Sequence, residues 1–425
     1  MVRLRGSGGA PAVGQGGEDR AEAGPSVSAG PVTEHPLHYL DEALRELRRD
    51  GLYRTLRELE GEQLPRARFD GREVINLSSN NYLGLTTHPK LKEAAIQAVR
   101  TLGAGSGSVR TIAGTMKLHM ELERRIAAFK KTEASVVFQS GFAANAGTVS
   151  SLLGKEDLII SDELNHASII DGARLSRAQI RVFPHRDVEA LERLLEETRD
   201  VKRRLVITDG VFSMDGDVAP LPKIAALARA HGAIMMIDDA HSSGVLGKAG
   251  RGTVDHFDLH GQVDVQVGTL SKAIGVLGGY VCGSKSLIEY LYHRARPFLF
   301  STSHPPAVAA ACLAAFDVLE QEPERIEKLW ANTRRFKAGL ARLGFNTGSS
   351  ETPITPILVG EADLAMRFSD RLFERGVFAQ GIGYPTVAKG KARLRTIVTA
   401  THTDEDLDRA LSILGEVGRT LGVVP

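Results

Sequence analysis

From about residue 82 onward, short apolar runs alternate with longer stretches of helical periodicity. The apolar runs are ASVVFQ, DLIIS, RVF, RLVITDG, AIMMIDD, DVQVGTL and GGYVCG, and the helical stretches include DVEALERLLEETRD and PLPKIAALARAHG. Strands and helices in alternation predict an α/β fold, in which helices cover both faces of a mainly parallel sheet. Ligands of such sheets bind at the carboxyl ends of the strands.

The pattern is different at both ends of the chain. Residues 1–35 are rich in Gly, Ala, Pro and Ser, which predicts a disordered tail because ordering them would bury little. Residues 36–81 are expected to form an N-terminal arm, with a helix in LHYLDEALRELRRDG and a strand in REVINLSS. After a large domain over residues 82–310, long amphipathic helices surround TPILVG and ARLRTIVTA, so residues 311–425 are predicted to form a smaller α+β domain.

Composition narrows the class of protein. The chain has 425 residues, of which 42% are hydrophobic and 25% charged, as in soluble globular proteins. A formal net charge of +1 gives no overall field that would attract nucleic acid, and no apolar run approaches the length of a membrane span. Cys282 and Cys312 lie in VCG and AACLAA, which suit small buried side chains rather than disulfides. We expect a cytoplasmic protein without nucleic-acid or membrane partners.

Polar side chains follow several of the predicted strands. These residues are Asp209, Asp238, Asp239, His241, Thr269 and Lys272. Lys272, in GTLSKAIG, is the most unusual, because desolvation at a strand end penalises a charged amine. It is either a surface lysine whose ammonium reaches water or a lysine that forms a Schiff base.

Two other motifs have more than one interpretation. The glycines of GAGSGSVRTIAG invite a dinucleotide-binding reading, but that fingerprint needs a preceding strand, and the helical PKLKEAAIQAVRTLG precedes this one. They are better explained by close approach of the backbone to a ligand or a second subunit. The two acids and the histidine of IDDAHSSG allow a metal site, but HEXXH and cysteine clusters are missing, so no metal is expected.

A third motif is either a plain strand-to-helix turn or an anion site. In ASVVFQSGFAANAG a strand ends at Ser140 and a helix is predicted to start near Gly141, where free N–H groups and the helix dipole attract a phosphate. A lysine, an aspartate and such a helix start together suit pyridoxal 5'-phosphate (PLP). The lysine holds the aldehyde, the helix start holds the phosphate, and the carboxylate keeps the pyridine nitrogen protonated.

The chain closely resembles the α-oxoamine synthases, which are PLP-dependent enzymes of fold type I. The resemblance extends from about residue 36 to the C-terminus and rests on SSNNYLGL, GSGSVRTIAGT, QSGFAANAG, DELNHASIIDG, TDGVFSMDGD, IDDAHSSGVLG, GTLSKAIG, RPFLFSTSHPP and ARLRTIVTA, in that order. It implies a large domain with a mainly parallel sheet and a smaller C-terminal α+β domain. It also implies a homodimer whose active sites lie at the interface.

The resemblance also implies roles for individual residues. Lys272 would form the Schiff base, Asp238 would pair with the pyridine nitrogen, and His166 would stack on the ring. The other expected cofactor contacts are His241, Ser213, Gly141, Phe142 and Thr269, with Ser301 and Thr302 reaching the phosphate of the second subunit. The expected substrate contacts are Arg54, Asn80, His166 and Arg395.

Members of this family join an amino acid to an acyl-CoA and release CoA. Two substrate pairs compete for this chain: L-alanine with pimeloyl-CoA, giving 8-amino-7-oxononanoate, and glycine with acetyl-CoA, giving 2-amino-3-oxobutyrate. Arg54 favours the first pair, whereas ITPILVG and GKARLRTIVTATHT resemble enzymes of the second. Ile397 stands where enzymes of the first subgroup commonly have a threonine that contacts the substrate. One enzyme using both pairs is a third possibility. Alternatives are 5-aminolevulinate synthase, a serine palmitoyltransferase-like enzyme, an aminotransferase or lyase of the same fold, and a non-catalytic PLP-binding protein.

Overall fold

The computed structural model describes residues 35–50, 52, 53 and 55–425. The tail expected over residues 1–35 lies almost wholly outside this part, and so does Arg54. Residues 1–53 and 54–425 form two separate units. In the first unit, helix α1 (Tyr39–Arg49) corresponds to the predicted amphipathic helix, and all of its side chains are exposed.

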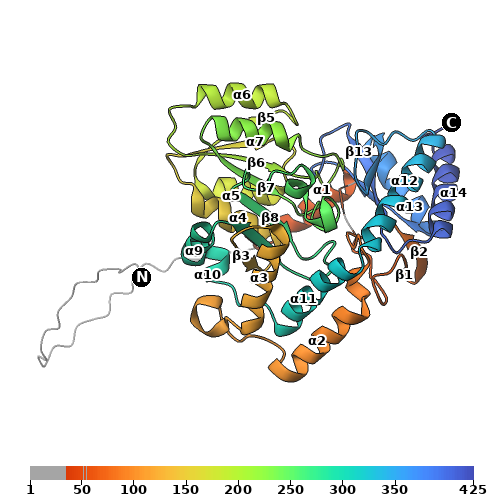
Figure 1. The fold of residues 1–425 in the computed structure, drawn as a ribbon. Helices are drawn as coiled ribbons and strands as arrows, with labels where there is room; N and C mark the ends of the chain where they lie inside the picture. The colour runs from red at the N-terminus through yellow and green to blue at the C-terminus, as the bar shows by residue number, and fades with distance from the viewer. Residues whose placement is uncertain (1–34, 51, 54) are drawn as a thin grey trace, which may run out of the picture. The chain divides into compact units, whose positions relative to one another are not determined.

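A seven-stranded sheet lies at the centre of the second unit (Figure 1). Its strands, in spatial order, are β3 (Ala134–Phe138), β9 (Gly279–Gly283), β8 (Val265–Thr269), β7 (Ile234–Asp238), β6 (Arg204–Asp209), β4 (Leu158–Asp162) and β5 (Gln179–Phe183). Strand β9 is antiparallel to both of its neighbours, and the other pairs are parallel. The predicted α/β fold with a mainly parallel sheet is confirmed.

Helices cover both faces of this sheet, because the side chains of each buried strand alternate between two cores. Ile159 packs with α4 (Gly141–Leu152), α5 (Ala167–Ser176), α9 (Lys285–Arg294) and α10 (Arg296–Leu299). Leu158 and Ile160 face the other way, toward α6 (Val188–Glu197), α7 (Leu221–Ala230) and α8 (Thr253–His256). Helices α2 (Pro89–Leu102), α3 (Lys117–Lys130) and α11 (Pro306–Gln321) share a further core with β3 and β9.

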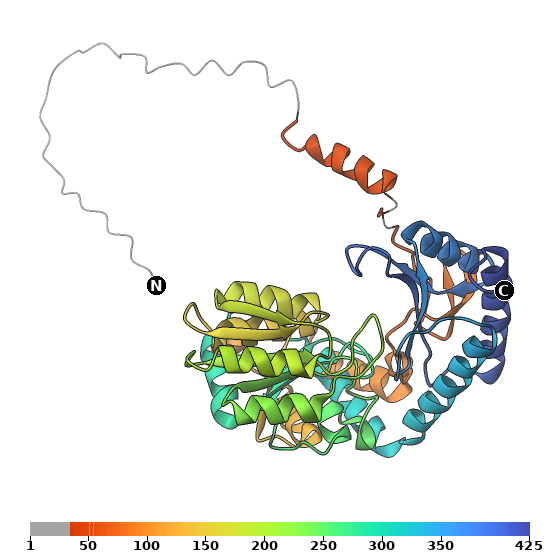
Figure 2. The same cartoon turned by 90° about the horizontal axis from the view of Figure 1, so that it is seen from above.

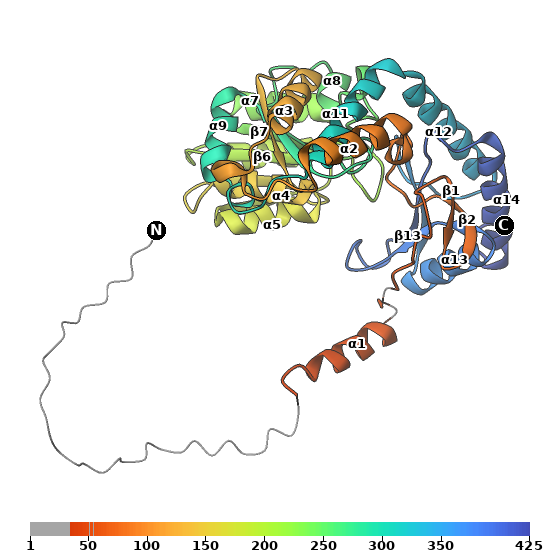
Figure 3. The same cartoon turned by 90° about the horizontal axis from the view of Figure 1, so that it is seen from below.

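The smaller C-terminal domain contains two three-stranded sheets (Figures 2 and 3). One has the order β1 (Arg66–Phe69), β2 (Arg72–Asn76), β11 (Val377–Phe378), and the other β10 (Ile354–Gly360), β13 (Ala392–Ile397), β12 (Gln380–Ile382). Helices α12 (Glu324–Arg342), α13 (Ala362–Glu374) and α14 (Asp404–Thr420) pack against them. Strand β2 pairs with β11, so residues of the predicted arm complete a sheet formed near the C-terminus.

Short helical turns connect these elements. They are Leu85–Thr87, a π-helical turn at Arg110–Gly114, and Lys248–Gly250. Both cysteines are free and buried, as predicted. Among the described residues, no helix is long and apolar enough to cross a membrane.

Candidate active site

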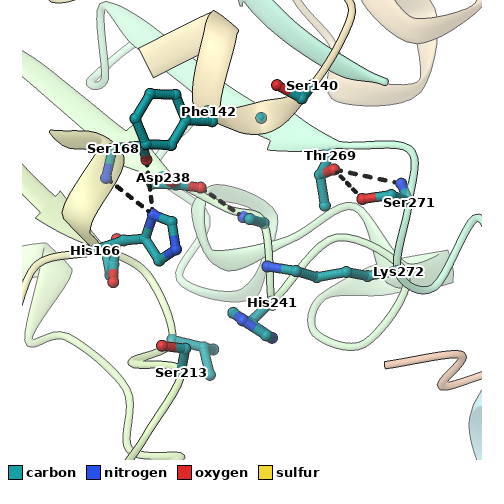
Figure 4. A pocket seen from close by; sticks show the side chains of 14 residues that line it. Ser140, Phe142, His166, Ser168, Ser213, Asp238, His241, Thr269, Ser271 and Lys272 are labelled. Atoms are coloured by element: carbon teal, nitrogen blue, oxygen red, sulfur yellow. Dashed lines mark hydrogen bonds between the residues drawn. The ribbon is translucent and has the colours of Figure 1, made fainter. Parts of the chain in front are cut away.

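A cavity of about 210 Å³ lies at the carboxyl ends of the central strands (Figure 4). Eight of the predicted site residues line it: Gly141, Phe142, His166, Ser213, Asp238, His241, Thr269 and Lys272. They come from separate segments between Gly141 and Lys272. They meet because parallel strands end at one edge of a sheet.

Lys272 extends into this cavity three residues after β8 ends (Figure 4). Its amine has no hydrogen bond to any described residue, so it is available to a ligand. Burial lowers the pKa of Lys272 to about 8, against the opposing effect of Asp238, and the positive charge of Arg395 lowers it further. A lysine with such a pKa is partly neutral near physiological pH and is therefore nucleophilic. The environment matches that of a Schiff-base lysine and not of a surface lysine.

The two acids at the end of β7 have different surroundings. Asp238 faces the cavity, where its carboxylate accepts hydrogen bonds from Asn145 Nδ2 at 2.6 Å and from the backbone N–H of Ala240 at 2.8 Å. Asp239 points away and forms a fully buried ion pair of 2.7 Å with Lys130. Successive side chains of a strand point to opposite faces, so only the first acid reaches a ligand in the cavity.

His166 is held by a hydrogen-bond network that also holds Asp238. Its Nδ1 lies 2.7 Å from Ser168 Oγ, and Ser168 Oγ accepts a hydrogen bond of 2.9 Å from Asn145. Burial lowers the pKa of His166, with a smaller contribution from the charge of Lys272, so the imidazole is neutral near pH 7. Asn145 and Ser168 were not predicted from the sequence, because neither carries a titratable group.

An anion site is present at the start of α4. Ser140 caps this helix by accepting a hydrogen bond of 3.1 Å from the N–H of Ala143. The N–H groups of Gly141 and Phe142 have no carbonyl partner within the helix. A Cβ atom on Gly279 would lie 2.3 Å from the Ser140 carbonyl oxygen, so only glycine allows β9 to approach this turn. The hydroxyl of Thr269 lies beside it and donates to the Gly278 carbonyl.

His241 is buried at the edge of the cavity and contacts Tyr82, whose hydroxyl lies 2.8 Å from His241 Nδ1. Burial lowers the pKa of His241 well below its usual value, and Lys272 and Arg395 lower it further. Because the neutral imidazole carries one proton, the contact with Tyr82 helps to determine which of its two nitrogens is protonated. Tyr82 was not predicted from the sequence, where it reads as part of the apolar pattern of NNYLGL.

Asp209, at the end of β6, also lines the cavity next to Asp238. Burial and the nearby Asp238 charge raise the pKa of Asp209 well above its usual value, and its Oδ1 has no hydrogen-bond partner in the part of the chain that the structure describes. The two neighbouring carboxyl groups therefore differ: Asp238 is stabilised by two donors, whereas Asp209 is favoured in its protonated form.

Arg395 and Asn80 lie in a second group next to the cavity. Arg395 donates through Nε to the Ser213 carbonyl at 2.6 Å, and through both terminal nitrogens to Asn80 Oδ1 at 3.3 Å. Arg395 lines a depression of about 290 Å³ that lies beside Ser213. Within the described residues no carboxylate pairs with this guanidinium, and burial lowers its pKa. An uncompensated, partly buried arginine is suited to bind a carboxylate from a ligand.

The remaining predicted contacts are not in the cavity. Thr302 is exposed, and its carbonyl accepts a hydrogen bond from Gln139 Nε2. Ser301 is half-buried and does not line the cavity either. Two large apolar side chains near this segment are strongly exposed, Ile112 at 82% and Phe300 at 69%.

The alternative interpretations find no support in the geometry. No group of three or more His, Cys, Asp or Glu side chains among the described residues is arranged to hold a metal ion. The GAGSGSVRTIAG segment follows helix α2 and leads into the π-helical turn, so it lacks the strand that a dinucleotide fingerprint requires.

The residues that line the cavity fit PLP. Three groups lie together at one edge of the sheet: an amine with no partner among the described residues, a carboxylate held by hydrogen bonds, and the start of α4, which Gly279 of β9 can approach closely. These groups match the aldehyde, the pyridine nitrogen and the phosphate of PLP, respectively.

Comparison with known proteins supports this assignment. Residues 72–414 match the family described as aminotransferase class I and II. The chain is 63% identical to the 8-amino-7-oxononanoate synthase of Symbiobacterium thermophilum, over 91% of this chain and 99% of that protein. It is 58% identical to 8-amino-7-oxononanoate synthase 1 of Bacillus subtilis, over 91% of this chain and 98% of that protein.

A solved structure shows the same fold. A serine palmitoyltransferase from S. paucimobilis with a bound PLP–myriocin aldimine superposes with a TM-score of 0.87 at 32% identity, covering 91% of this chain and 98% of that one. PLP is therefore the cofactor of this protein, as the cavity indicates. The chain belongs to the aminotransferase class I and II family and, within it, to the PLP-dependent α-oxoamine synthases of fold type I.

Proposed function

We propose that the protein is an acyltransferase that joins L-alanine to pimeloyl-CoA and gives 8-amino-7-oxononanoate, CoA and carbon dioxide. The observation that carries the chemistry is the amine of Lys272 in one cavity with Asp238, beside Arg395; among the described residues the amine has no hydrogen-bond partner and the arginine has no carboxylate partner. The choice of this substrate pair rests on the names of relatives that are 63% and 58% identical over 91% of the chain.

Each residue of the cofactor site would contact a different part of PLP. PLP, when bound, withdraws electrons from the α-carbon of the amino acid. Asp238 holds the pyridine nitrogen in its protonated form, and Asn145 keeps that carboxylate in place. His166, neutral because of its lowered pKa, covers one face of the ring without adding a competing charge. The N–H groups at the start of α4 hold the phosphate.

Lys272 would move protons at the α-carbon of the amino acid. Its pKa of about 8 leaves a useful neutral fraction near pH 7, so the amine accepts the α-proton of alanine as a general base. A bond then forms between the α-carbon and the thioester carbonyl, and the carbon–sulfur bond breaks with release of CoA. Loss of the alanine carboxylate as carbon dioxide, and return of a proton from Lys272 to the same carbon, give the amino ketone.

Arg395 orients the amino acid. The Ser213 carbonyl and Asn80 fix the plane of the guanidinium, and the N–H groups of its terminal nitrogens that these contacts do not use are available to the substrate carboxylate. We also propose that Arg54 contacts the acyl substrate.

Glycine with acetyl-CoA remains the second candidate pair. Ile397 stands where enzymes that use alanine and pimeloyl-CoA commonly have a threonine that contacts the substrate. In the structure Ile397 is fully buried, and its backbone N–H donates to the Leu77 carbonyl. Its side chain lines neither the cofactor cavity nor the depression that Arg395 lines. A buried core position at this point of β13 is compatible with either pair.

We further propose a homodimer, in which Ser301 and Thr302 reach the phosphate of the second subunit. Their position outside this chain's own cavity and the exposed Ile112 and Phe300 nearby support that arrangement. The domain limits at residues 82 and 311 and a cytoplasmic location also remain proposals.

The test is release of CoA thiol by PLP-loaded protein, with alanine or glycine each supplied with pimeloyl-CoA or acetyl-CoA. We expect turnover with alanine and pimeloyl-CoA, and mass spectrometry should identify 8-amino-7-oxononanoate as the product. Turnover with glycine and acetyl-CoA alone would replace this assignment by the second pair, and turnover with both would establish a dual enzyme. No thiol release with any pair, in protein that retains PLP, would refute the proposed function.

A further inference from the structure

The loop of residues 210–218 connects the cofactor cavity with the smaller domain. It follows β6 and folds back on itself, because Val211 bridges Val218 and the N–H of Gly216 donates to the Phe212 carbonyl at 2.8 Å. Ser213 near its tip lines the cavity. The position of this loop therefore affects the cofactor cavity directly.

On one side, the loop is held by His185, which follows β5. His185 Nε2 lies 2.9 Å from Asp217 in the loop, and Nδ1 lies 3.0 Å from Asp162 at the end of β4. The imidazole also packs edge-on against Phe212 of the loop, with ring centroids 4.3 Å apart. Asp162 and Asp217 are almost completely buried, so neither carboxylate has water as an alternative partner.

The contacts define the charge of His185. A carboxylate only accepts hydrogen bonds, so an imidazole that bonds two of them must carry a proton on both nitrogens. Burial by itself lowers the pKa of His185, but the hydrogen bonds to Asp162 and Asp217 outweigh it and raise the pKa to about 9. Three other charged groups lie here. Arg186 also contacts Asp217, and Glu351 pairs with Arg186. Glu163 accepts a hydrogen bond from the backbone N–H of His185.

On the other side, the same loop holds the two arginines of β13. The Ser213 carbonyl accepts from Arg395 Nε at 2.6 Å, and Arg393 donates to the Met214 carbonyl and to Asp215. Gly216 adopts φ +73°, and a Cβ there would lie 2.2 Å from the Ile354 carbonyl oxygen, so the loop lies directly against β10. A shift of the loop would move the acceptor that orients Arg395.

We infer that His185 is a positioning residue for the amino-acid substrate: as an imidazolium between Asp162 and Asp217 it fixes the 210–218 loop, and the loop fixes the guanidinium of Arg395. This inference rests on the proposed function, because it assigns Arg395 to the substrate carboxylate. His185 does not line the cavity, so it acts through the loop and not on the reacting atoms.

The inference gives a pH dependence with a definite sign. The two hydrogen bonds from His185 to Asp162 and Asp217 form a clamp on the loop. Because the pKa of His185 is raised on folding, this clamp is fully formed below the ordinary histidine pKa of about 6.5 and is lost as the pH rises through about 9. Above that pH the His185 imidazole is neutral, so one of its nitrogens presents a lone pair to Asp162 or Asp217, and that hydrogen bond is lost. Affinity for the amino acid should therefore fall between about pH 8 and 10.

The experiment measures the dissociation constant of alanine from the PLP-loaded enzyme by the change in cofactor absorbance, without acyl-CoA, from pH 6.5 to 10. We expect His185→Gln to weaken alanine binding about tenfold at pH 7 and to flatten the pH dependence above pH 8. Asp217→Asn should do the same, and combining the two should add little, because both break one clamp. His293→Gln, at an exposed histidine of α9, is the control and should match the wild type.

Each outcome has a separate meaning. Unchanged alanine affinity and pH profile in His185→Gln and Asp217→Asn, with PLP bound, would overturn the inference and leave the proposed function intact. Weaker binding with the wild-type pH profile would also overturn it, because that pattern indicates a general structural effect. If no amino acid alters the spectrum of the wild-type enzyme, the proposed function itself fails. PLP content and the thermal midpoint are measured for each variant, and an unfolded His185→Gln protein leaves Asp217→Asn to decide.

Discussion

The side-chain amide of Asn145 in α4 donates a hydrogen bond of 2.6 Å to the carboxylate of Asp238 at the end of β7. The same amide donates to Ser168, which holds His166. One uncharged residue thus fixes the carboxylate expected at the pyridine nitrogen and the imidazole expected on the ring. Its position explains why a helix rich in small residues carries a buried asparagine.

Replacing Asn145 by Ala should lower kcat about 10- to 100-fold, because a buried hydrogen bond to a charged group contributes about 1.5–3 kcal/mol. PLP should remain bound, since its phosphate contacts lie elsewhere. Steady-state kinetics and cofactor absorbance test this expectation, with Asn346→Ala at an exposed loop position as the control. Asp238→Asn should have a larger effect on kcat. An Asn145→Ala enzyme with wild-type kcat would show that Asp238 needs no support from α4.

Replacing Lys272 by Ala should leave the fold intact and reduce turnover by at least about 10³-fold, because both the Schiff-base amine and the general base are lost. Borohydride reduction followed by peptide mass spectrometry should label Lys272 with PLP in the wild type. Lys155→Ala, at an exposed turn, is the control: it should be labelled at Lys272 and should be as active as the wild type. Substantial turnover in the Lys272 variant would contradict the assignment.

The pKa of Lys272 leads to a separate pH prediction. Only the neutral amine attacks an aldehyde, and the neutral fraction rises as the pH passes the pKa of about 8. Uptake of PLP by the cofactor-free protein should therefore accelerate from pH 6.5 to 9 and level off above that. Stopped-flow absorbance measures this rate, and a rate that stays constant across the range would show that the amine is not controlled by its burial.

Gly279→Ala should reduce PLP affinity about tenfold or more. The new methyl group would lie 2.3 Å from the Ser140 carbonyl oxygen, so β9 and the start of α4 must separate, and overpacking of this kind costs about 1–3 kcal/mol. Equilibrium dialysis measures the retained cofactor. Gly154→Ala is a suitable control because an added Cβ there meets nothing closer than 3.9 Å. Equal retention by the two variants would exclude a tight turn as part of the phosphate site.

Lys130→Met should destabilise the protein by about 3–5 kcal/mol, because Asp239 would remain buried and charged without its partner. The adjacent Lys131→Met is a matched control: its pair with Asp255 has a lysine side chain that is 49% exposed, so the expected loss is about 1 kcal/mol or less. Urea unfolding of the two variants gives the comparison. A similar loss in both would mean that burial of the Lys130 pair has no special effect.

Much of the large domain was predictable from local patterns. The central strands and the helices α6 and α7 lie where the apolar periodicity placed them, and α4 begins at Gly141 as expected. In the smaller domain, β1, β11 and β12 were not predicted. These strands have two to four residues, which is too short for a clear period, and β11 exists as a strand only because it pairs with β2.

The sequence by itself indicated the candidate residues: Lys272, Asp238 and the Gly141 turn stand out because charge or glycine follows an apolar strand, and His166 was expected from the resemblance to the α-oxoamine synthases. Only the tertiary structure decided which neighbours support them. Asn145, Tyr82 and His185 contribute through contacts with residues 93, 159 and 32 positions away in the chain, respectively. A local pattern records what each residue is, whereas a hydrogen bond between distant segments depends on where folding brings them together.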